Sequence, residues 1–140
     1  MSSALRYSLD ANAISRLLQK DPQALEGFSQ ACRQCEVVIC PMAAYEVWRW
    51  LFSRKATRQL EDLEELMSRC LWHDFTREIW RSAAQHWAEL REKGVGLDKR
   101  DADLLIASHA RHLGATVITE DRDFNQLPCE WVRWADLGEH

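Results

Sequence analysis

Long apolar runs and targeting signals are missing from this 140-residue sequence. No apolar run reaches the roughly 18 residues that a transmembrane helix needs, so we expect no membrane partner. Residues 1–6, MSSALR, do not have the charged-then-apolar layout of a secretion signal. We therefore expect a cytoplasmic protein.

Glycine-rich phosphate-binding loops are also missing. The chain has five glycines and three prolines, and neither a GxGxxG nor a Walker A pattern occurs. This disfavours the classes of enzyme that hold a nucleotide cofactor on such a loop. No serine or cysteine has the partners of an evident catalytic triad.

Paired metal-binding cysteine motifs are lacking as well. The five cysteines are an odd number in a chain without a secretion signal, which indicates reduced thiols. Cys32 and Cys35 have the spacing of a redox or zinc motif, but no second pair stands at metal spacing. We interpret them as thiols that fill a core. A zinc site would require Cys40 and a histidine to converge on them.

Positive charge is in deficit, because 18 Lys and Arg face 22 Asp and Glu, for a net charge of −4. The overall field of the protein therefore does not attract nucleic acid. Any such partner must be contacted through a local patch.

The residues that are present describe an ordinary globular chain, with 46% apolar and 29% charged residues. This length suits one domain over residues 1–140. Apolar or alternating runs predict strands at 5–9, 37–40, 71–75, 115–119 and 131–134. Amphipathic segments predict a helix capped by residues 10–12, a helix starting at Asp21-Pro22, helices over 43–53 and 56–69, one from Thr76 to Lys93, and one from Asp98 or Asp101 to Gly114. The alternation predicts a three-layer α/β fold with a mainly parallel central sheet flanked by helices.

Acidic residues follow two of the predicted strands. Asp10 ends the first strand, and Asp121 and Asp123 follow the strand at 115–119. In open parallel sheets, ligands bind beyond the carboxyl ends of the strands. Two separate strands therefore bring acids to the same edge.

Two predicted helices add further acids. Asp103 lies three, four and seven residues before the apolar Ile106, Ala107 and Ala110. A carboxylate on an apolar helix face is costly to bury unless it is paired, protonated or bound to a metal. Glu46 stands early in the helix over 43–53.

Each acid also has a structural interpretation. Asp10 and Asn12 could simply cap a helix, Asp101 could interact with a helix dipole, and Glu46 could pair with Arg49. Four or five carboxylates at one edge would, however, repel one another strongly unless divalent cations neutralised them. Hard oxygen donors select Mg²⁺ or Mn²⁺, and such ions suit the attack of water on a phosphodiester. Two bound ions would cancel about four negative charges and let RNA approach.

The same segments carry a resemblance to PIN-domain ribonucleases, and specifically to the VapC toxins of toxin–antitoxin pairs. Residues 9–15 (LDANAIS) resemble the family's opening motif, and residues 114–124 (GATVITEDRDF) resemble its last one. The weaker matches are residues 41–47, which contain Glu46, and residues 101–107 (DADLLIA). Ala11 departs from the threonine that is usual in the family, and Glu120 replaces a common asparagine.

The resemblance implies a PIN-like fold and a set of site residues. It places metal-site acids at Asp10, Glu46, Asp103 and Asp121, an accessory acid at Asp123, orienting side chains at Asn12 and Thr119, and a neighbouring acid at Asp101. It also implies an endoribonuclease dependent on Mg²⁺ or Mn²⁺, often acting on tRNA. The implied partners are a VapB-like antitoxin and a second copy of the chain in a homodimer.

Two other classes of function stay open. One is a catalytically weak PIN scaffold that mainly binds a protein. The other is an Asp-dependent phosphatase or phosphoreceiver. Such phosphatases, however, require a DxD motif, and this chain has Asp10-Ala11-Asn12 in that place.

The seven tryptophans are many for this length, and several stand next to arginine. They could stack on RNA bases, form a protein interface or fill the core. For Trp48, Trp50 and the charged helix over 56–69, we favour an interface with the antitoxin or a second copy. We expect His109 and His112 on a helix surface.

Overall fold

The central sheet has five strands that all run parallel. The computed structural model describes residues 5–96 and 100–139. Its strands are β1 (Arg6–Leu9), β2 (Glu36–Ile39), β3 (Leu71–Trp72), β4 (Thr116–Ile118) and β5 (Trp131–Val132), in the order β3-β2-β1-β4-β5. Each neighbouring pair is parallel. The predicted three-layer α/β architecture is therefore confirmed.

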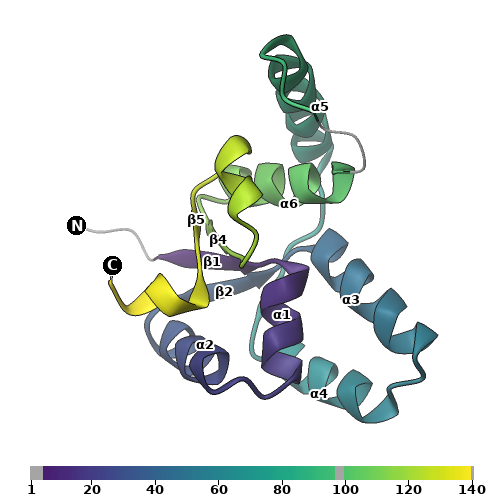
Figure 1. Cartoon of the computed structure of the whole chain (residues 1–140), viewed down its shortest axis with the longest axis vertical. Coiled ribbons are helices and arrows are strands. Elements are labelled where there is room, and N and C mark those ends of the chain that lie inside the picture. The colour runs from purple at the N-terminus through teal and green to yellow at the C-terminus, as the bar shows by residue number, and fades with distance from the viewer. Residues whose placement is uncertain (1–4, 97–99, 140) are drawn as a thin grey trace.

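Helices cover both faces of this sheet. They are α1 (Ala11–Leu18), α2 (Pro22–Gln34), α3 (Pro41–Ser53), α4 (Thr57–Met67), α5 (Arg77–Glu92) and α6 (Asp101–His112), with two short 3₁₀ helices, η1 (Arg122–Gln126) and η2 (Trp134–Glu139). In Figure 1, α6 and α2 lie on opposite sides of the strands, and α5 projects from the body beyond α6. None of the described helices is long and apolar enough to cross a membrane.

The apolar residues of the three central strands form the core of the fold. Leu9, Val38, Ile39, Val117 and Ile118 are all at most 1% exposed. Strands covered on both faces need such continuous apolar runs. In the register, Leu9 stands opposite both Ile39 and Ile118. The residues that follow β1, β2 and β4 therefore lie side by side at the carboxyl edge of the sheet.

Several element boundaries differ from those predicted. β3 stops at Trp72, because its neighbour β2 ends at Ile39 and offers no further partner. Helix α3 starts at Pro41, which can occupy the first helical position because its missing N–H has no acceptor there. The alternative start at Asp98 lies outside the described residues, and α6 begins at Asp101.

The interpretation of Asn12 as a helix cap and the surface position predicted for His109 are both wrong. Asp10 caps α1, but Asn12 lies inside the helix and bonds elsewhere. His109 is fully buried instead of lying on the helix surface. Its Nε2 donates to the carbonyl of His73 at 2.8 Å, and its ring packs 4.9 Å from Phe75.

The five cysteines are all free thiols in the structure. Burial raises the pKa of Cys40 to about 12. Such a thiol stays protonated and unreactive at neutral pH. Cys32 and Cys35 are partly buried against the core, which fits the packing role that the sequence suggested for them.

Candidate functional site

Asp10 stands at the centre of the carboxyl edge of the sheet. It follows β1, and its backbone N–H donates to the carbonyl of Ile118 at 3.0 Å. Its side chain is only 4% exposed. One oxygen, Oδ1, accepts from the N–H of Ala11 at 2.8 Å, which caps α1. The pKa of Asp10 is raised to about 6. Burial is the main cause, the charges of Asp103 and Glu46 act in the same direction, and the hydrogen bonds from Thr119 and Ala11 act against them.

Thr119 links the segments after β1 and β4. Its hydroxyl donates to Oδ2 of Asp10 at 2.8 Å and accepts from the N–H of Asp121 at 3.1 Å. The amide Nδ2 of Asn12 donates to the same hydroxyl oxygen at 3.1 Å, and its Oδ1 accepts from the N–H of Glu120 at 3.0 Å. Thr119 and Asn12 therefore fix the Asp10 carboxylate relative to the loop that carries Asp121.

We predict that Thr119→Val uncouples these two segments. The change keeps the shape of the side chain but leaves Asp10 without its buried hydroxyl donor, which costs about 1–3 kcal/mol of folding stability. Any activity that depends on Asp10 should fall about 10- to 100-fold, as when an outer partner of a ligand is removed. Urea unfolding and an activity assay measure both effects. Thr119→Ser keeps the hydroxyl and serves as the control. Equal behaviour of the Val and Ser variants would contradict the prediction.

Glu46 and Asp103 reach the same edge from α3 and α6. Burial raises the pKa of Glu46, the Asp103 charge raises it further, and Arg49 lowers it. The Arg49 contact is long, with 3.9 Å between Nη2 and Oε2 of Glu46. The surface ion pair considered from the sequence therefore exists, but it does not outweigh the other two causes.

Asp103 connects the group to Asp121 and Asp123. Burial raises its pKa, and the charges of Asp121 and Asp123 raise it further. Arg100 acts in the opposite direction, with Nε 3.4 Å from Oδ2 of Asp103. Asp121 also caps η1 through the N–H of Asp123. The structure thus gathers Asp10, Glu46, Asp103, Asp121 and Asp123 from separate segments.

Arg100 is a residue that the sequence analysis missed. Its guanidinium also contacts Oε1 of Gln126 at 3.4 Å, while its other nitrogen, Nη2, is buried without a partner among the described residues. The spacing of three residues before Asp103 was the available signal, because such residues are neighbours on a helix surface.

Two further acids lie apart from this group. Asp101 is exposed and lines a pocket between α5 and α6 with Trp80 and Leu105. Glu120 is neutralised by two arginines, with Arg16 at 3.1 Å and Arg133 at 3.2 Å. Glu120 therefore adds no free negative charge to the edge.

The gathered carboxylates are the right kind of ligand for a divalent cation, but their side chains are not arranged around a common point in this structure. Within residues 5–96 and 100–139, no three His, Cys, Asp or Glu side chains stand together closely enough to hold a metal ion. The donors are nevertheless hard oxygens, the ligands that Mg²⁺ and Mn²⁺ prefer. Burial, and to a lesser extent the neighbouring carboxylates, raise the pKa values of Asp10, Glu46 and Asp103. A cation would relieve their mutual repulsion once the side chains turn toward it.

The two tryptophans of α3 differ in their surroundings. Trp48 is half-buried, its Nε1 donates to Oε2 of Glu64 at 3.4 Å, and its ring centroid lies 6.1 Å from that of Trp72. Trp50 is 59% exposed and lines a pocket beside Glu46.

The fold and the site together define a class of protein, namely an α/β protein with a parallel sheet and several carboxylates gathered at its carboxyl edge. The model of the PIN domain family matches residues 7–128, and the chain belongs to this family. No curated protein matches the chain.

Solved structures resemble the chain over nearly its whole length. A chain from the DNA-bound VapBC structure of Salmonella typhimurium is 26% identical, with a TM-score of 0.80, covering 93% of this chain and 98% of that one. A chain from VapBC2 of Rickettsia felis, bound to a DNA fragment from their promoter, is 22% identical, with a TM-score of 0.85 and coverage of 93% and 99%. A chain from VapBC-1 of nontypeable Haemophilus influenzae is 22% identical, with a TM-score of 0.78 and coverage of 94% and 99%. The resemblance to the VapC proteins of the PIN family is confirmed.

Proposed function

We propose that the protein is a metal-dependent endoribonuclease and the toxin of a toxin–antitoxin pair. The observation that carries the proposal is the group of partly buried acids, from four segments of the chain, at the carboxyl edge of the sheet. Asp10, Glu46, Asp103 and Asp121 would hold Mg²⁺ or Mn²⁺, with Asp123 as an accessory. A bound divalent cation lowers the pKa of an attacking water and stabilises the charge on the leaving oxygen of a phosphodiester.

The residues around the acids have supporting tasks in this proposal. Thr119 and Asn12 hold Asp10 in one orientation, because the Thr119 hydroxyl and the Asn12 amide Nδ2 both donate to Oδ2 of Asp10, at 2.8 and 3.3 Å. Arg100 limits the charge repulsion at Asp103. The raised pKa values of Asp10 and Glu46 favour any ligand that brings positive charge to the edge.

An Asp-dependent phosphatase or phosphoreceiver is less well supported. Both oxygens of Asp10 already accept hydrogen bonds, Oδ1 from Ala11 and Oδ2 from Thr119. This arrangement reduces the nucleophilicity of the carboxylate. Because Oδ2 also accepts from Nδ2 of Asn12 at 3.3 Å, Oδ1 is the oxygen that keeps a lone pair for a cation. Formation of a beryllofluoride adduct on Asp10 would favour the phosphatase.

The direct test is cleavage of labelled tRNA by the purified protein. We expect cleavage with Mg²⁺ or Mn²⁺ and none with EDTA, because uncompensated acids repel the phosphate. For the same reason RNA binding should weaken in EDTA as well as in high salt. Sequencing of cleaved 5′ ends in cells that express the protein, beside an Asp10→Ala control, would identify the target. Absence of cleavage in both metals would contradict the nuclease and leave the protein-binding scaffold.

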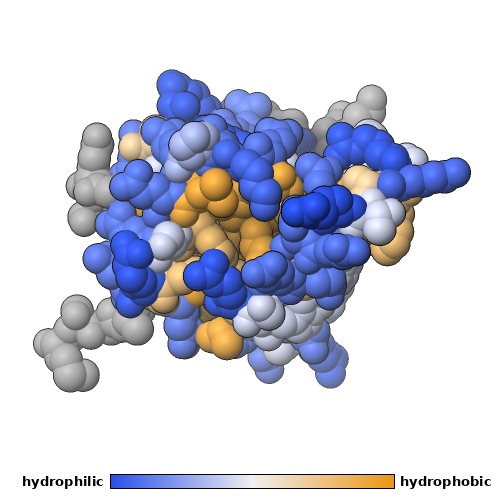
Figure 2. Space-filling view, turned by 90° about the horizontal axis from the view of Figure 1, so that it is seen from below, coloured by the Kyte–Doolittle hydropathy of each residue, from blue (hydrophilic) through white to orange (hydrophobic). Residues whose placement is uncertain are grey.

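The antitoxin is proposed to bind on the side of α1, α2 and α4. The solved structures named above are of VapBC assemblies. Figure 2 views this side and shows apolar side chains gathered in a hollow. Leu17, Leu18, Leu25, Phe28 and Leu66 line a cavity of about 160 Å³ there, with Lys20, Asp62, Glu65 and Arg69 at its margin. An amphipathic helix fits an apolar groove with charged margins. Light scattering of the protein, alone and with a co-expressed antitoxin, would test this partner and the proposed homodimer.

A further inference from the structure

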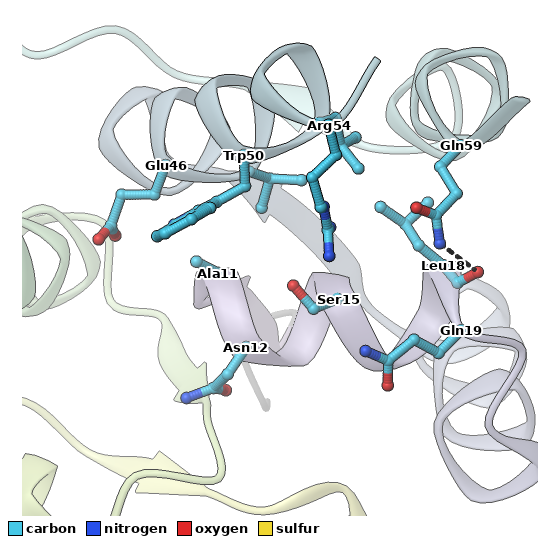
Figure 3. A pocket seen from close by; sticks show the side chains of 11 residues that line it. Ala11, Asn12, Ser15, Leu18, Gln19, Glu46, Trp50, Arg54 and Gln59 are labelled. Carbon is cyan, nitrogen blue, oxygen red and sulfur yellow. Dashed lines mark hydrogen bonds between the residues drawn. The ribbon is translucent and has the colours of Figure 1, made fainter. Parts of the chain in front are cut away.

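A pocket of about 340 Å³ extends from the acidic edge along the space between α1 and α3. Glu46 and Trp50 of α3 and Arg54, which caps the end of that helix, follow one another at intervals of four residues, which places them on one side of it. Figure 3 shows these side chains along α3 and at its end, with Asn12 and Ser15 of α1 and Gln19 at its end opposite them. Gln59 of α4 lies at the end away from Glu46. The pocket therefore begins at the candidate metal site and leads away from it.

Two side chains of this pocket have no structural task in the described part of the chain. Trp50 is 59% exposed and stacks on no other aromatic ring there, whereas Trp48 packs against Trp72 and Trp80 against Phe75. Arg54 forms no salt bridge within residues 5–96 and 100–139. An exposed indole and an uncompensated guanidinium, one helical turn apart, are available to a ligand.

We propose that this pocket is a nucleotide-binding subsite for single-stranded RNA. Trp50 stacks on one base, and Arg54 contacts a backbone phosphate. The hydroxyl of Ser15 and the amide of Gln19 offer donors and acceptors to the edge of the base. The subsite rests on the proposed nuclease function, because it positions the nucleotide that neighbours the cleaved phosphodiester.

The spacing along α3 supports this placement. Four residues of helix advance by about 6 Å, so Trp50 lies about one such step from Glu46, and Arg54 lies one step farther. A strand whose phosphate meets the acids at Glu46 would thus pass the indole and then the guanidinium. Stacking on an aromatic side chain combined with phosphate contacts is the usual means of binding a single strand.

The lining of the pocket favours RNA over a protein partner. Two of its polar members, Ser15 and Gln19, offer neutral hydrogen bonds of the type that bases make, whereas Asn12 and Gln59 already bond within the protein. The apolar groove between α1, α2 and α4, with its leucines and Phe28, is instead suited to a protein helix. An antitoxin contact at Trp50, which the sequence analysis favoured, is the alternative that the experiment separates.

The experiment compares Trp50→Ala and Arg54→Gln with wild-type protein. A fluorescein-labelled single-stranded octaribonucleotide is titrated with each protein in Mg²⁺ on an Asp10→Asn background, and cleavage of tRNA is measured without that background. We expect Trp50→Ala to weaken binding and to raise KM about 5- to 100-fold, with a smaller change in kcat. Trp50→Phe should restore most of the binding. Arg54→Gln should lower the slope of log K against log salt by about 0.7.

Matched controls lie outside the pocket. Phe52→Ala removes another exposed aromatic side chain of α3, and Arg33→Gln removes an exposed guanidinium of α2. Both should leave octanucleotide binding and KM unchanged. Circular dichroism of each variant checks the fold.

The outcomes distinguish the subsite from the nuclease itself. If wild-type protein cleaves RNA but Trp50→Ala and Arg54→Gln bind and cleave like the controls, the subsite is overturned while the nuclease stands. If wild-type protein binds the octanucleotide through Trp50 and Arg54 without cleaving tRNA, the subsite stands and the nuclease fails. If Trp50→Ala weakens only the co-expressed antitoxin, Trp50 belongs to a protein interface and the proposal is wrong.

Discussion

Asp103→Asn is expected to lower kcat/KM for metal-dependent RNA cleavage by about 10³-fold, equivalent to about 4 kcal/mol of transition-state stabilisation. Asn keeps the shape of the side chain but cannot supply the negative charge that attracts a divalent cation. Asp103 has the strongest case for this role, because the charges of Asp121 and Asp123 act on it and its own charge acts on Asp10 and Glu46.

Two other acids serve as comparisons for Asp103. Glu89 of α5 is exposed and lies outside the acidic edge, so Glu89→Gln controls for the loss of one negative charge. Asp101 stands two residues before Asp103 but lines the pocket between α5 and α6, so we expect Asp101→Asn to change the rate less than about threefold. Full RNA cleavage by Asp103→Asn, with metal present, would contradict the assignment of the acids as metal ligands.

Asp10→Asn is expected to stabilise the metal-free protein at pH 7.5 by about 2 kcal/mol. The ordinary pKa of 3.8 rises to about 6 in the folded protein. Folding thus disfavours the ionised form by about 3 kcal/mol, because a tenfold change in an acid dissociation constant corresponds to about 1.4 kcal/mol. The variant loses a smaller favourable interaction of the carboxylate with the start of α1, worth about 0.3–1 kcal/mol. Asn is as good a helix cap as Asp, so the cap itself is kept.

The pH dependence of the difference between the two proteins follows from the same raised pKa. The contribution of Asp10 to the folding stability of the wild-type protein is fully present below pH 3.8, where its carboxyl group is protonated in both states. It is lost as the pH rises through about 6. The gain from Asp10→Asn should therefore be near zero at pH 4 and complete above pH 7. Burial lowers the pKa of His109, whose protonation destabilises the fold in acid, so the difference between the proteins is the useful quantity. Urea unfolding in EDTA measures it, and a gain that is equal at both pH values would refute the raised pKa of Asp10.

The central strands were predictable because burial on both faces forces an unbroken apolar run. Residues 37–40 form such a run, and only two threonines interrupt it in residues 115–119; β2 and β4 lie within these segments or at their edge. The end of β3 was not predictable, because it depends on where the neighbouring β2 stops pairing. The position of His109 was missed for a similar reason, since its partner is the carbonyl of His73, 36 residues earlier.

The acids were predictable as a group, but their surroundings were not. Asp10 and Asp121 follow strands, and the rule that parallel strands end at one edge sufficed to place them together. The bonds of Thr119 to Asp10 and Asp121 join segments that only the fold brings together. The pocket at Trp50 likewise requires α1 and α3 to lie side by side, which no local pattern in either helix specifies.

The bond between Thr119 and Asp10 spans 109 residues of sequence, and it has a consequence for synthesis of the protein. β4 must pair with β1 before Asp121 reaches the acidic edge, so the edge is complete only after residue 121 has left the ribosome. At about 5–20 residues per second, this delay lasts several seconds after Asp10 is made. Nascent chains are therefore harmless to RNA under the proposed function, and the interval gives a partner protein time to meet the toxin as its site forms.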